Sequence, residues 1–453
     1  MLIKKLYETY KAIVGQEITL KGWVRTNRDS GKVGFISLND GSYLDSIQVV
    51  YNQEIKTFNF IKSLRTGASI AVTGVLVLPD KGKGKELFEI KAKNIKIYNN
   101  AVEQYPLQKK EHSNEYLREI PHLRARTNKF WAIFKIRSSV SYAIHFFFQR
   151  NDFLYLHSPI ITSNDAEGAG EAFIVTTRED NNYQQDFFSK KANLTVSGQL
   201  NAEAYAQAFN RVYTFGPTFR AEKSHTSRHV AEFWMVEPEV AYSSLEENMK
   251  LGEELIKYII NYILENNKKE LKFLNDNVDN NLLDKLKTIV TVKFVIMTYD
   301  DAIMELIKVK DRFENQDIHW GMDLQTEHER YLCEQLTNKP TFITNYPQVI
   351  KAFYMKTNED NKTVQAMDLL VPGIGELIGG SQREDNYEKL LAKMQMANLD
   401  IKDFQWYLNL RQYGYAPSGG FGLGLERLIM YLTGVTNIRD VLPFPRVPNS
   451  LEF

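Results

Sequence analysis

A glycine-rich stretch near the end of the sequence, Gly-Gly-Phe-Gly-Leu-Gly-Leu-Glu-Arg-Leu at residues 419–428, has the composition of a ligand-binding backbone. On a strand, the missing side chains of Gly420, Gly422 and Gly424 let a flat ligand lie against the chain. Neither the Lys-Ser or Lys-Thr of a P-loop nor the ribose-binding acid of a dinucleotide fold follows. Apolar residues at helical spacing predict a helix that begins near Gly424. Arg427 then lies in the first turn, where the helix end favours a terminal phosphate.

A second stretch predicts a hairpin, because two short apolar segments flank the polar loop 223–231. Arg220 and Glu222 are two residues apart, so we expect them on one face of the first strand. A guanidinium can hold two oxygens of one phosphate, and a neighbouring carboxylate can accept an exocyclic amine. The alternative interpretation is an ordinary exposed cross-strand pair of Arg220 and Glu222.

Three further residues of this hairpin have the side chains that a bound nucleotide requires. Phe233 on the return strand can stack on a base, and Arg228 and His229 in the loop can reach the outer phosphates. On this interpretation Arg220 and Arg427 bind opposite ends of a triphosphate.

A third stretch, residues 367–384, adds two acids to a glycine-rich strand. Asp368 and Glu376 supply hard oxygen ligands, which suit an Mg²⁺ ion that bridges phosphates. Surface acids are the alternative, but the glycine content of the strand argues against it.

Length and charge place these stretches in a multidomain protein. The chain has 453 residues and no net charge, which argues against a general nucleic-acid coat protein. Residues 1–100 hold 16 Lys and Arg against 9 Asp and Glu, a net charge of +7, so this part is expected to contact a polyanion. A single cysteine, Cys333, excludes a disulfide framework, and neither a secretory nor a membrane-spanning segment is predicted. We therefore expect a cytoplasmic protein.

The first hundred residues read as five short strands with one helical stretch, about 55–64, between the third and the fourth. This order is typical of an OB barrel, whose open face binds single-stranded nucleic acid. The predicted strands cover residues 17–26, 32–38, 45–51, 69–78 and 86–98.

The remaining sequence predicts a connector and a second, larger domain. Residues 101–127 are polar, and Thr127 is a plausible N-cap for the helix that follows. Ser244 and Glu247 form a capping box before another helix, which opens an excursion over about 244–300 that includes the Asn- and Lys-rich stretch 265–280.

Together these stretches resemble the three signature motifs of class II aminoacyl-tRNA synthetases, over essentially all 453 residues. Motif 1 matches the helix after residue 127 with the strand at Phe153–Pro159, motif 2 matches residues 219–233, and motif 3 matches residues 420–427. The resemblance implies an N-terminal OB-fold anticodon-binding domain (1–100), a linker (101–127) and an α+β catalytic domain on a mainly antiparallel sheet (128–453). It further implies a homodimer formed through motif 1, with the opening glycines making room for the adenine and ribose of ATP.

The segment Ser197-Gly-Gln-Leu-Asn-Ala-Glu203 bears on the amino-acid substrate. Aspartyl enzymes place a lysine where Ala202 stands, whereas asparaginyl-tRNA synthetases have the Gln-Leu-x-x-Glu pattern seen here. By that resemblance, Arg383 donates to the side-chain oxygen of L-asparagine and Glu203 accepts from its amide nitrogen. Gln199 and Glu167 bind the α-ammonium group by the same resemblance. An aspartate would set a second carboxylate against Glu203, a like-charge contact of several kcal/mol.

The implied reaction has two steps. Asparagine attacks the α-phosphorus of ATP to give asparaginyl-adenylate and pyrophosphate, and the terminal adenosine of tRNA(Asn) then takes the amino acid. Arg220 and Mg²⁺ neutralise the α-phosphate, while Arg228, His229 and Arg427 hold the outer phosphates.

Three alternatives stay open at this point. The first is an aspartyl-tRNA synthetase, including one that also charges tRNA(Asn), although Ala202 argues against it. The second is an asparagine synthetase on the same catalytic fold, a family that lacks the OB module. The third is a non-catalytic RNA-binding relative, which is expected to have lost Arg220, Glu222, Arg383 or Arg427.

The resemblance also implies which residues of the barrel read the anticodon. Phe35 occupies the place of an aromatic residue that stacks on the middle anticodon base, with Arg28, Gln48 and Glu89 on neighbouring strands as readers of base edges. A core position for Phe35 is the alternative. Residues 33 and 35 fall on one face of the strand and residues 36 and 38 on the other, so one set faces out of the barrel.

Overall fold

The computed structural model describes residues 1–79, 87–163, 172–224 and 226–453. The chain divides into two compact units, Met1–Ala132 and Ile133–Phe453. None of the helices within the described ranges is long and apolar enough to cross a membrane.

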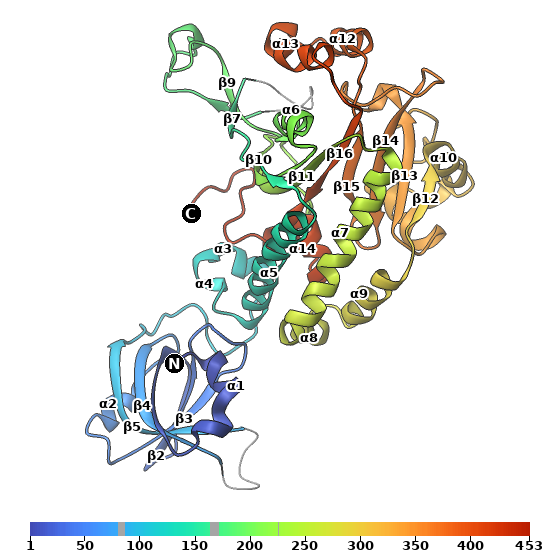
Figure 1. Cartoon of the computed structure of the whole chain (residues 1–453). Helices are drawn as coiled ribbons and strands as arrows, with labels where there is room; N and C mark the ends of the chain where they lie inside the picture. The colour runs from blue at the N-terminus through green and yellow to red at the C-terminus, as the bar shows by residue number, and fades with distance from the viewer. Residues whose placement is uncertain (80–86, 164–171, 225) are drawn as a thin grey trace. The chain divides into compact units, whose positions relative to one another are not determined.

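The first unit contains a closed five-stranded barrel with the strand order β1-β2-β3-β5-β4 (Figure 1). Its elements are α1 (Ile3–Ile13), β1 (Glu17–Asp29), β2 (Val33–Asn39), β3 (Ile47–Asn52), α2 (Phe58–Lys62), β4 (Ser69–Val77) and β5 (Glu89–Asn99). The five predicted strands and the helix between the third and the fourth are confirmed. Helix α1 was not predicted; its Ile3 and Leu6 are buried in the barrel core.

The barrel core decides which side of β2 faces solvent. Ile36 and Leu38 are fully buried, whereas Phe35 is only half-buried and lies on the opposite face of the strand. Antiparallel pairing sets Arg28 of β1 opposite Phe35, and β1 contains an irregularity between Val24 and Thr26. The outer face of the barrel therefore carries Phe35, as the alternation of the sequence required.

The polar segment after the barrel forms two short helices, α3 (Asn114–Glu119) and α4 (Pro121–Arg124), and leads into the long helix α5 (Asn128–Arg150). The Ser113 side chain caps α3 by accepting from the Tyr116 amide. Helix α5 begins directly after Thr127, as predicted.

The second unit is built on an eight-stranded sheet with the order β12-β13-β14-β15-β16-β11-β10-β6. Only the outermost pairs, β12 with β13 and β6 with β10, are parallel, so the mainly antiparallel sheet is confirmed. Its strands are β6 (Leu154–Tyr155), β10 (Arg211–Phe219), β11 (Glu232–Ala241), β12 (Val295–Thr298), β13 (Thr341–Pro347), β14 (Thr363–Val371), β15 (Gly375–Gln382) and β16 (Ser418–Gly424). A separate three-stranded sheet consists of β7 (Ile161–Thr162), β9 (Ala192–Leu194) and β8 (Ile174–Val175).

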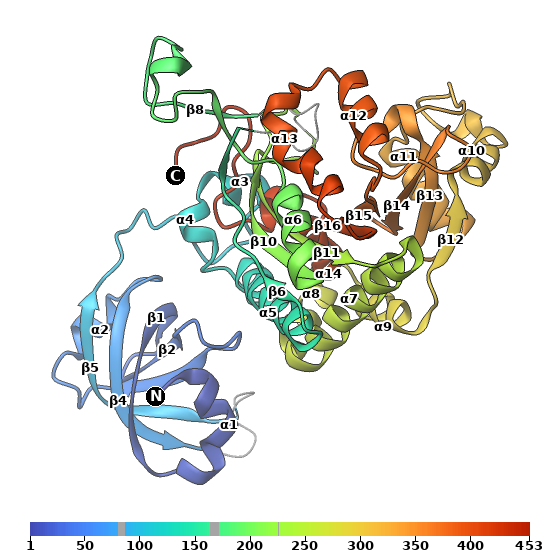
Figure 2. The ribbon, with the colours of Figure 1, turned by 45° about the horizontal axis from the view of Figure 1, so that its top comes forward.

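Helices cover the large sheet. Helix α7 begins with the predicted capping box of Ser244 and Glu247, and its Gly252 lies against Ile378 of β15. Helices α5 and α7 run side by side in both views (Figures 1 and 2). The Phe147 ring of α5 contacts the Tyr258 ring of α7. The helices are α6 (Gln199–Phe209), α7 (Leu245–Asn266), α8 (Lys268–Asn277), α9 (Leu282–Thr291), α10 (Tyr299–Ile307), α11 (Thr326–Arg330), α12 (Tyr387–Met396), α13 (Ile401–Asn409) and α14 (Leu425–Thr433).

The Asn- and Lys-rich stretch after α7 is more ordered than a surface excursion. It folds into α8, whose Leu271 and Leu274 are fully buried, followed by α9 with the buried Leu282 and Leu286. The many polar residues occupy the exposed side of these helices.

Candidate active site

The hairpin of β10 and β11 forms one wall of a cavity of about 120 Å³ at the centre of the large sheet. The prediction that Arg220 and Glu222 lie on the first strand was wrong, because β10 ends at Phe219. The Arg220 amide still donates to the Ala231 carbonyl, so the chain leaves the strand only gradually. The loop that follows takes both side chains to the cavity.

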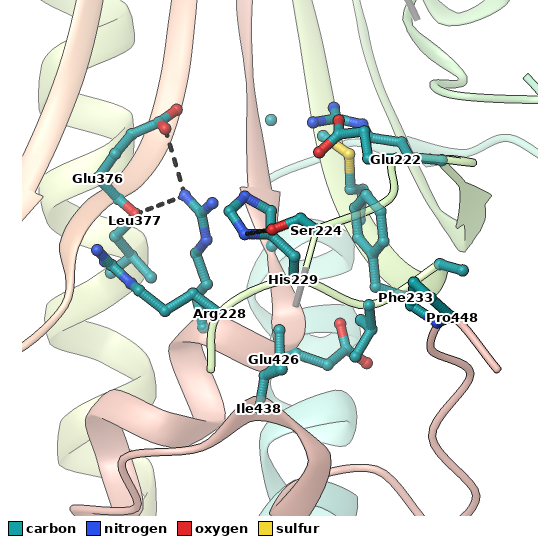
Figure 3. A pocket seen from close by; sticks show the side chains of 17 residues that line it. Glu222, Ser224, Arg228, His229, Phe233, Glu376, Leu377, Glu426, Ile438 and Pro448 are labelled. Atoms are coloured by element: carbon teal, nitrogen blue, oxygen red, sulfur yellow. Dashed lines mark hydrogen bonds and ion pairs between the residues drawn. The ribbon is translucent and has the colours of Figure 1, made fainter. Parts of the chain in front are cut away.

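This first cavity, here called the nucleotide cavity, brings together residues from four distant parts of the sequence (Figure 3). All of the side chains and the glycine that were predicted to bind ATP line it: Arg220, Glu222, Arg228, His229, Phe233, Glu376, Gly424 and Arg427. The Arg220 guanidinium lies 5.3 Å from the centroid of the Phe233 ring, so a cation and an aromatic face are presented together.

The glycine-rich strand contributes in two different ways. A Cβ at Gly424 would meet no atom within 4 Å, so this position is open toward the cavity that it lines. A Cβ at Gly420 would lie 2.5 Å from the Glu239 carboxyl carbon, so the absence of a side chain there makes room for Glu239. Only part of the glycine run therefore clears space for a nucleotide.

Helix α14 begins at Leu425, and the two charged residues of its first turn, Glu426 and Arg427, have different roles. Glu426 is buried and accepts from Arg137 of α5 at 2.7 Å and from the Trp234 amide of β11 at 3.0 Å. These bonds tie α14 to the long helix and to the hairpin. Arg427 then extends into the cavity, where its Nη1 donates to the Glu376 carbonyl at 3.0 Å and lies 3.3 Å from the Glu376 carboxylate.

Two basic side chains of the loop between β10 and β11 lie at the same end of the cavity as Arg427. Arg228 Nη1 donates to Thr326 Oγ1 at 2.7 Å, and its buried Nη2 has no hydrogen-bond partner in the described part of the chain. Burial, and secondly the nearby Arg427, lower the pKa of His229 below its ordinary value. Among the described residues, this end of the cavity therefore has positive charge and, on Arg228, an unpartnered donor that an anion would satisfy.

A second cavity of about 200 Å³ adjoins the first, and Arg220, Met235, Glu376 and Gly422 line both. We call it the amino-acid cavity. Its lining includes Gln199 and Arg383, which were predicted to bind the amino acid. The side-chain Nε2 of Gln199 is buried and, within the described ranges, has no hydrogen-bond partner.

Arg383 is held in a fixed position inside this cavity. Both it and Glu239 are buried, and the guanidinium forms a two-point ion pair with the Glu239 carboxylate, including a bond from Nε at 3.1 Å. Nη1 donates to Ser381 Oγ at 2.8 Å, and the Tyr354 ring lies 5.2 Å away. Burial lowers the pKa of Arg383, but attraction to Glu239 outweighs it, so the net shift is upward.

Glu203 occupies a different place from the predicted one. Its buried carboxylate accepts from Arg411, Tyr407 and Tyr415, each at 2.6 Å, and it does not line the amino-acid cavity. The carboxylate that faces the cavity beside Arg383 is Glu239. Glu167, the other acid predicted here, lies outside the described residues.

Asp368 and Glu376 converge at Gly379. A Cβ at Gly379 would lie 2.9 Å from Glu376 Oε1 and 3.5 Å from Asp368 Oδ1. Lys351 forms an ion pair with Asp368. Among the described residues no group of three acidic, His or Cys side chains is arranged for a metal. Two carboxylates fit an Mg²⁺ ion that takes its other ligands from phosphates and water, since this ion rarely uses an all-protein cage.

Sequence reasoning missed Glu239, Glu237 and Lys351. Glu237 accepts from the Gly198 amide at 3.0 Å and from Thr214 at 2.7 Å, and so positions the turn before Gln199. A signal was present, because residues 233, 235, 237 and 239 of β11 alternate onto one face of a strand. Lys351 follows a short turn after β13 and carried no comparable pattern.

The four residues predicted to read an anticodon lie on adjacent strands of the barrel. The Arg28 guanidinium is 5.9 Å from the centroid of the Phe35 ring, and Gln48 donates to Glu89 at 3.1 Å across the β3–β5 pair. The structure thus forms two neighbouring pairs on the barrel, one cationic and aromatic, the other an amide with a carboxylate.

Comparison with known proteins identifies the class. Residues 113–448 match the class II tRNA synthetases for D, K and N, and residues 18–98 match the OB-fold nucleic acid binding domain. The chain therefore belongs to the class II tRNA synthetases, and the resemblance seen in its motifs is confirmed.

Individual relatives show members of this class that the chain resembles in sequence and structure. The chain is 57% identical to an asparagine–tRNA ligase of Mycoplasma mycoides subsp. mycoides and 54% identical to one of Acetivibrio thermocellus, with 100% of this chain and at least 99% of each relative covered. Its structure matches the crystal structure of asparaginyl-tRNA synthetase from Pyrococcus horikoshii complexed with asparaginyl-adenylate with a TM-score of 0.87. The two sequences are 35% identical, and 97% of both chains is covered.

Proposed function

We infer that this chain ligates L-asparagine to tRNA in two steps, through asparaginyl-adenylate, with release of AMP and pyrophosphate. The observation that carries the inference is the buried Arg383–Glu239 pair, which faces a small cavity directly beside the nucleotide cavity. Full-length relatives at more than half identity are asparagine–tRNA ligases, and the Pyrococcus horikoshii relative was crystallised with asparaginyl-adenylate.

The pair suits a carboxamide better than a carboxylate. The carboxamide oxygen accepts from Arg383, and the amide nitrogen donates to Glu239, so both partners of the pair are satisfied. An aspartate would place a second negative charge against the buried Glu239, and a like-charge contact in a closed site costs several kcal/mol. We therefore assign the amide nitrogen to Glu239, because the Glu203 carboxylate already has three donors.

The remaining polar groups of the cavity suit the amino-acid backbone. The buried side-chain nitrogen of Gln199 has no partner in the described part of the chain, and its carbonyl oxygen is an acceptor for the α-ammonium group. We retain Glu167 as a second acceptor on the strength of the sequence resemblance.

The nucleotide cavity provides charge and positioning for the first step. Arg220 lines both cavities, so it lies where the α-carboxylate and the α-phosphate of ATP would meet. Arg228, His229 and Arg427 would hold the outer phosphates, and Phe233 would stack on adenine beside the amine acceptor Glu222. Mg²⁺ bound at Asp368 and Glu376 would supply charge neutralisation. No protein nucleophile is required, since orientation and electrostatics carry the rate.

The barrel is proposed to bind the anticodon of tRNA(Asn). Phe35 presents an aromatic face on the outside of the barrel beside Arg28, which is the combination that binds unpaired bases. Gln48 and Glu89 offer both donors and acceptors to base edges.

We further propose that the protein acts as a homodimer formed through α5 and β6. Tyr142 and Phe146 on α5 are 58% and 43% exposed, an unusual amount of aromatic surface for a helix that covers a sheet. Sedimentation would show a dimer, and Tyr142→Lys would shift it toward monomer. The cytoplasmic location and the domain limits 1–100, 101–127 and 128–453 stay predictions.

Asparagine-dependent exchange of pyrophosphate into ATP tests the proposed function. We expect exchange with asparagine and little exchange with the other nineteen amino acids. Equal or greater exchange with aspartate would instead identify an aspartyl enzyme, and no exchange with any amino acid would identify a non-catalytic relative.

A further inference from the structure

A basic and aromatic pocket lies in the first unit, apart from the strand face that carries Phe35. It encloses about 210 Å³ between β1, the turn before β4 and the segment that follows the barrel. Its lining includes Trp23, Arg25, Tyr105, Lys109, Lys110 and Arg126, and none of the described residues that line it carries a carboxylate.

The aromatic side chains of this pocket are held in place yet accessible. Trp23 is 44% exposed on β1, although it is a residue type that is usually covered. Tyr105 lies directly on Gly67, where a Cβ would be 2.9 Å from the ring and where φ is +91°. Only glycine allows both this turn and this close approach.

Two arginines in the pocket are close together, and neither has an acidic partner among the residues that the structure describes. Arg25 Nη1 donates to the Arg126 carbonyl, and Arg126 Nη1 donates to the Tyr105 hydroxyl at 3.2 Å, so both use neutral acceptors. Burial, together with the charge of Arg126, lowers the pKa of Arg25. Neighbouring guanidiniums without a carboxylate form a site with a strong preference for an anion.

Other cations of the same unit show the contrast. Lys62 is paired with Asp29 at 2.9 Å, and Lys93 is paired with Glu17 at 2.6 Å. Lys109 and Lys110 are exposed at the rim of the pocket. The cations that line the pocket have no ion pair with an acidic side chain of the described residues, whereas Lys62 and Lys93 of the same unit do.

We propose that this pocket binds a nucleotide of the tRNA outside its anticodon, with a backbone phosphate at Arg25 and Arg126 and the base or ribose against Trp23. The proposal rests on the inferred function, which supplies RNA as the partner. Trp23 and Arg28 are five positions apart on β1, about 16–17 Å at the rise of a strand, so a base against Trp23 is a different base from the one read beside Arg28. Stacking faces beside cations are the usual means of holding an RNA strand.

Binding of two RNAs separates this pocket from the anticodon-reading face. Whole tRNA(Asn) and its isolated anticodon stem–loop would be titrated against Trp23→Ala and against the double variant Lys109→Ala, Lys110→Ala. We expect about a tenfold or greater loss of affinity for whole tRNA with Trp23→Ala, and unchanged affinity for the stem–loop. Each lysine that contacts a phosphate is expected to lower the salt slope of binding by about one.

Matched variants test whether a loss of RNA affinity comes only from a general loss of positive charge or from misfolding. Lys4→Ala with Lys11→Ala removes the same charge from exposed positions of α1 and is expected to leave the salt slope nearly unchanged. Trp23→Phe keeps a stacking face and is expected to restore most of the affinity. Asparagine-dependent pyrophosphate exchange without tRNA should be normal in every variant, which shows an intact second unit.

Two results would overturn the proposal. Unchanged affinity for whole tRNA in both pocket variants would show that the pocket has no role in RNA binding. An equal loss for whole tRNA and stem–loop would assign Trp23 to the anticodon face or to barrel stability. A failure of the proposed function is distinct from either, since the unmodified protein would then lack exchange activity.

Discussion

The nucleotide cavity and the amino-acid cavity share a wall but handle charge in opposite ways. Within the described ranges, Arg228 of the nucleotide cavity has a buried nitrogen with no partner, and Arg427 contacts a single carboxylate at 3.3 Å. In the amino-acid cavity the principal cation, Arg383, is already paired with Glu239 and hydrogen-bonded to Ser381. The nucleotide cavity is therefore suited to a highly charged ligand, whereas the Arg383–Glu239 pair of the amino-acid cavity is neutral overall and offers a preorganised donor and acceptor.

This difference predicts distinct consequences of mutation. Loss of a cation from the nucleotide cavity removes charge stabilisation and lowers the rate with any amino acid. A change in the Arg383–Glu239 pair alters which amino acid is accepted, because specificity arises from leaving the wrong substrate with an unsatisfied or repelled group.

The largest effect is expected for Arg220→Ala and Arg427→Ala. Removing a group that stabilises developing charge typically costs about 10²–10³ in rate, and pyrophosphate exchange measures this directly. Arg178→Ala is a suitable control, since Arg178 is paired with Asp180 in a different region. Near-normal exchange in either test variant would remove that arginine from the ATP site.

An intermediate effect is expected on the barrel, where the ligand is RNA and neither cavity is involved. Phe35→Ala should reduce tRNA charging about tenfold or more, since a stacked base contributes roughly 1–3 kcal/mol. Amino-acid activation without tRNA should be unchanged. Phe60→Ala, which removes a 58% exposed ring from the same unit, serves as the control. If charging and activation fall together, Phe35 supports the barrel and does not read a base.

The smallest effect concerns the protonation of His229. Burial and Arg427 lower its pKa, so the imidazole is neutral at pH 7 in the free protein. Triphosphate at the same place favours the imidazolium and raises that pKa, so ATP binding takes up a proton and strengthens as the pH falls from 8 to 6. As the pH falls from 8 to 6, the KM for ATP of the unmodified protein should therefore decrease a few-fold more than the KM of His229→Asn. Parallel pH profiles would place His229 away from the phosphates.

The sequence was sufficient to locate the nucleotide cavity because its residues lie in short, recognisable segments. The glycines, the helix start and Arg427 fall within ten residues, and the hairpin contains both Arg220 and Phe233. Even there the end of β10 was misjudged, since the four residues directly after Phe219, Arg-Ala-Glu-Lys, include no turn former that would mark it.

The amino-acid cavity was harder to predict because it depends on pairing across the sheet. Glu239 and Arg383 are 144 positions apart and meet only because β16 lies between β11 and β15. Glu203 has the right residue type, but Arg411, 208 positions away, already binds its carboxylate. A local pattern indicates which side chains are available and cannot show which of them are already neutralised.

We propose that Glu239, paired with Arg383, selects asparagine over aspartate. Pyrophosphate exchange with the two amino acids would be compared for the unmodified protein, Glu239→Gln and Glu203→Gln. We expect Glu239→Gln to lower the asparagine-to-aspartate ratio of kcat/KM by about a hundredfold, because repulsion of several kcal/mol is removed. Glu203→Gln should leave the ratio nearly unchanged. A ratio that stays constant in Glu239→Gln and falls in Glu203→Gln would show that Glu203, and not Glu239, selects the amino acid.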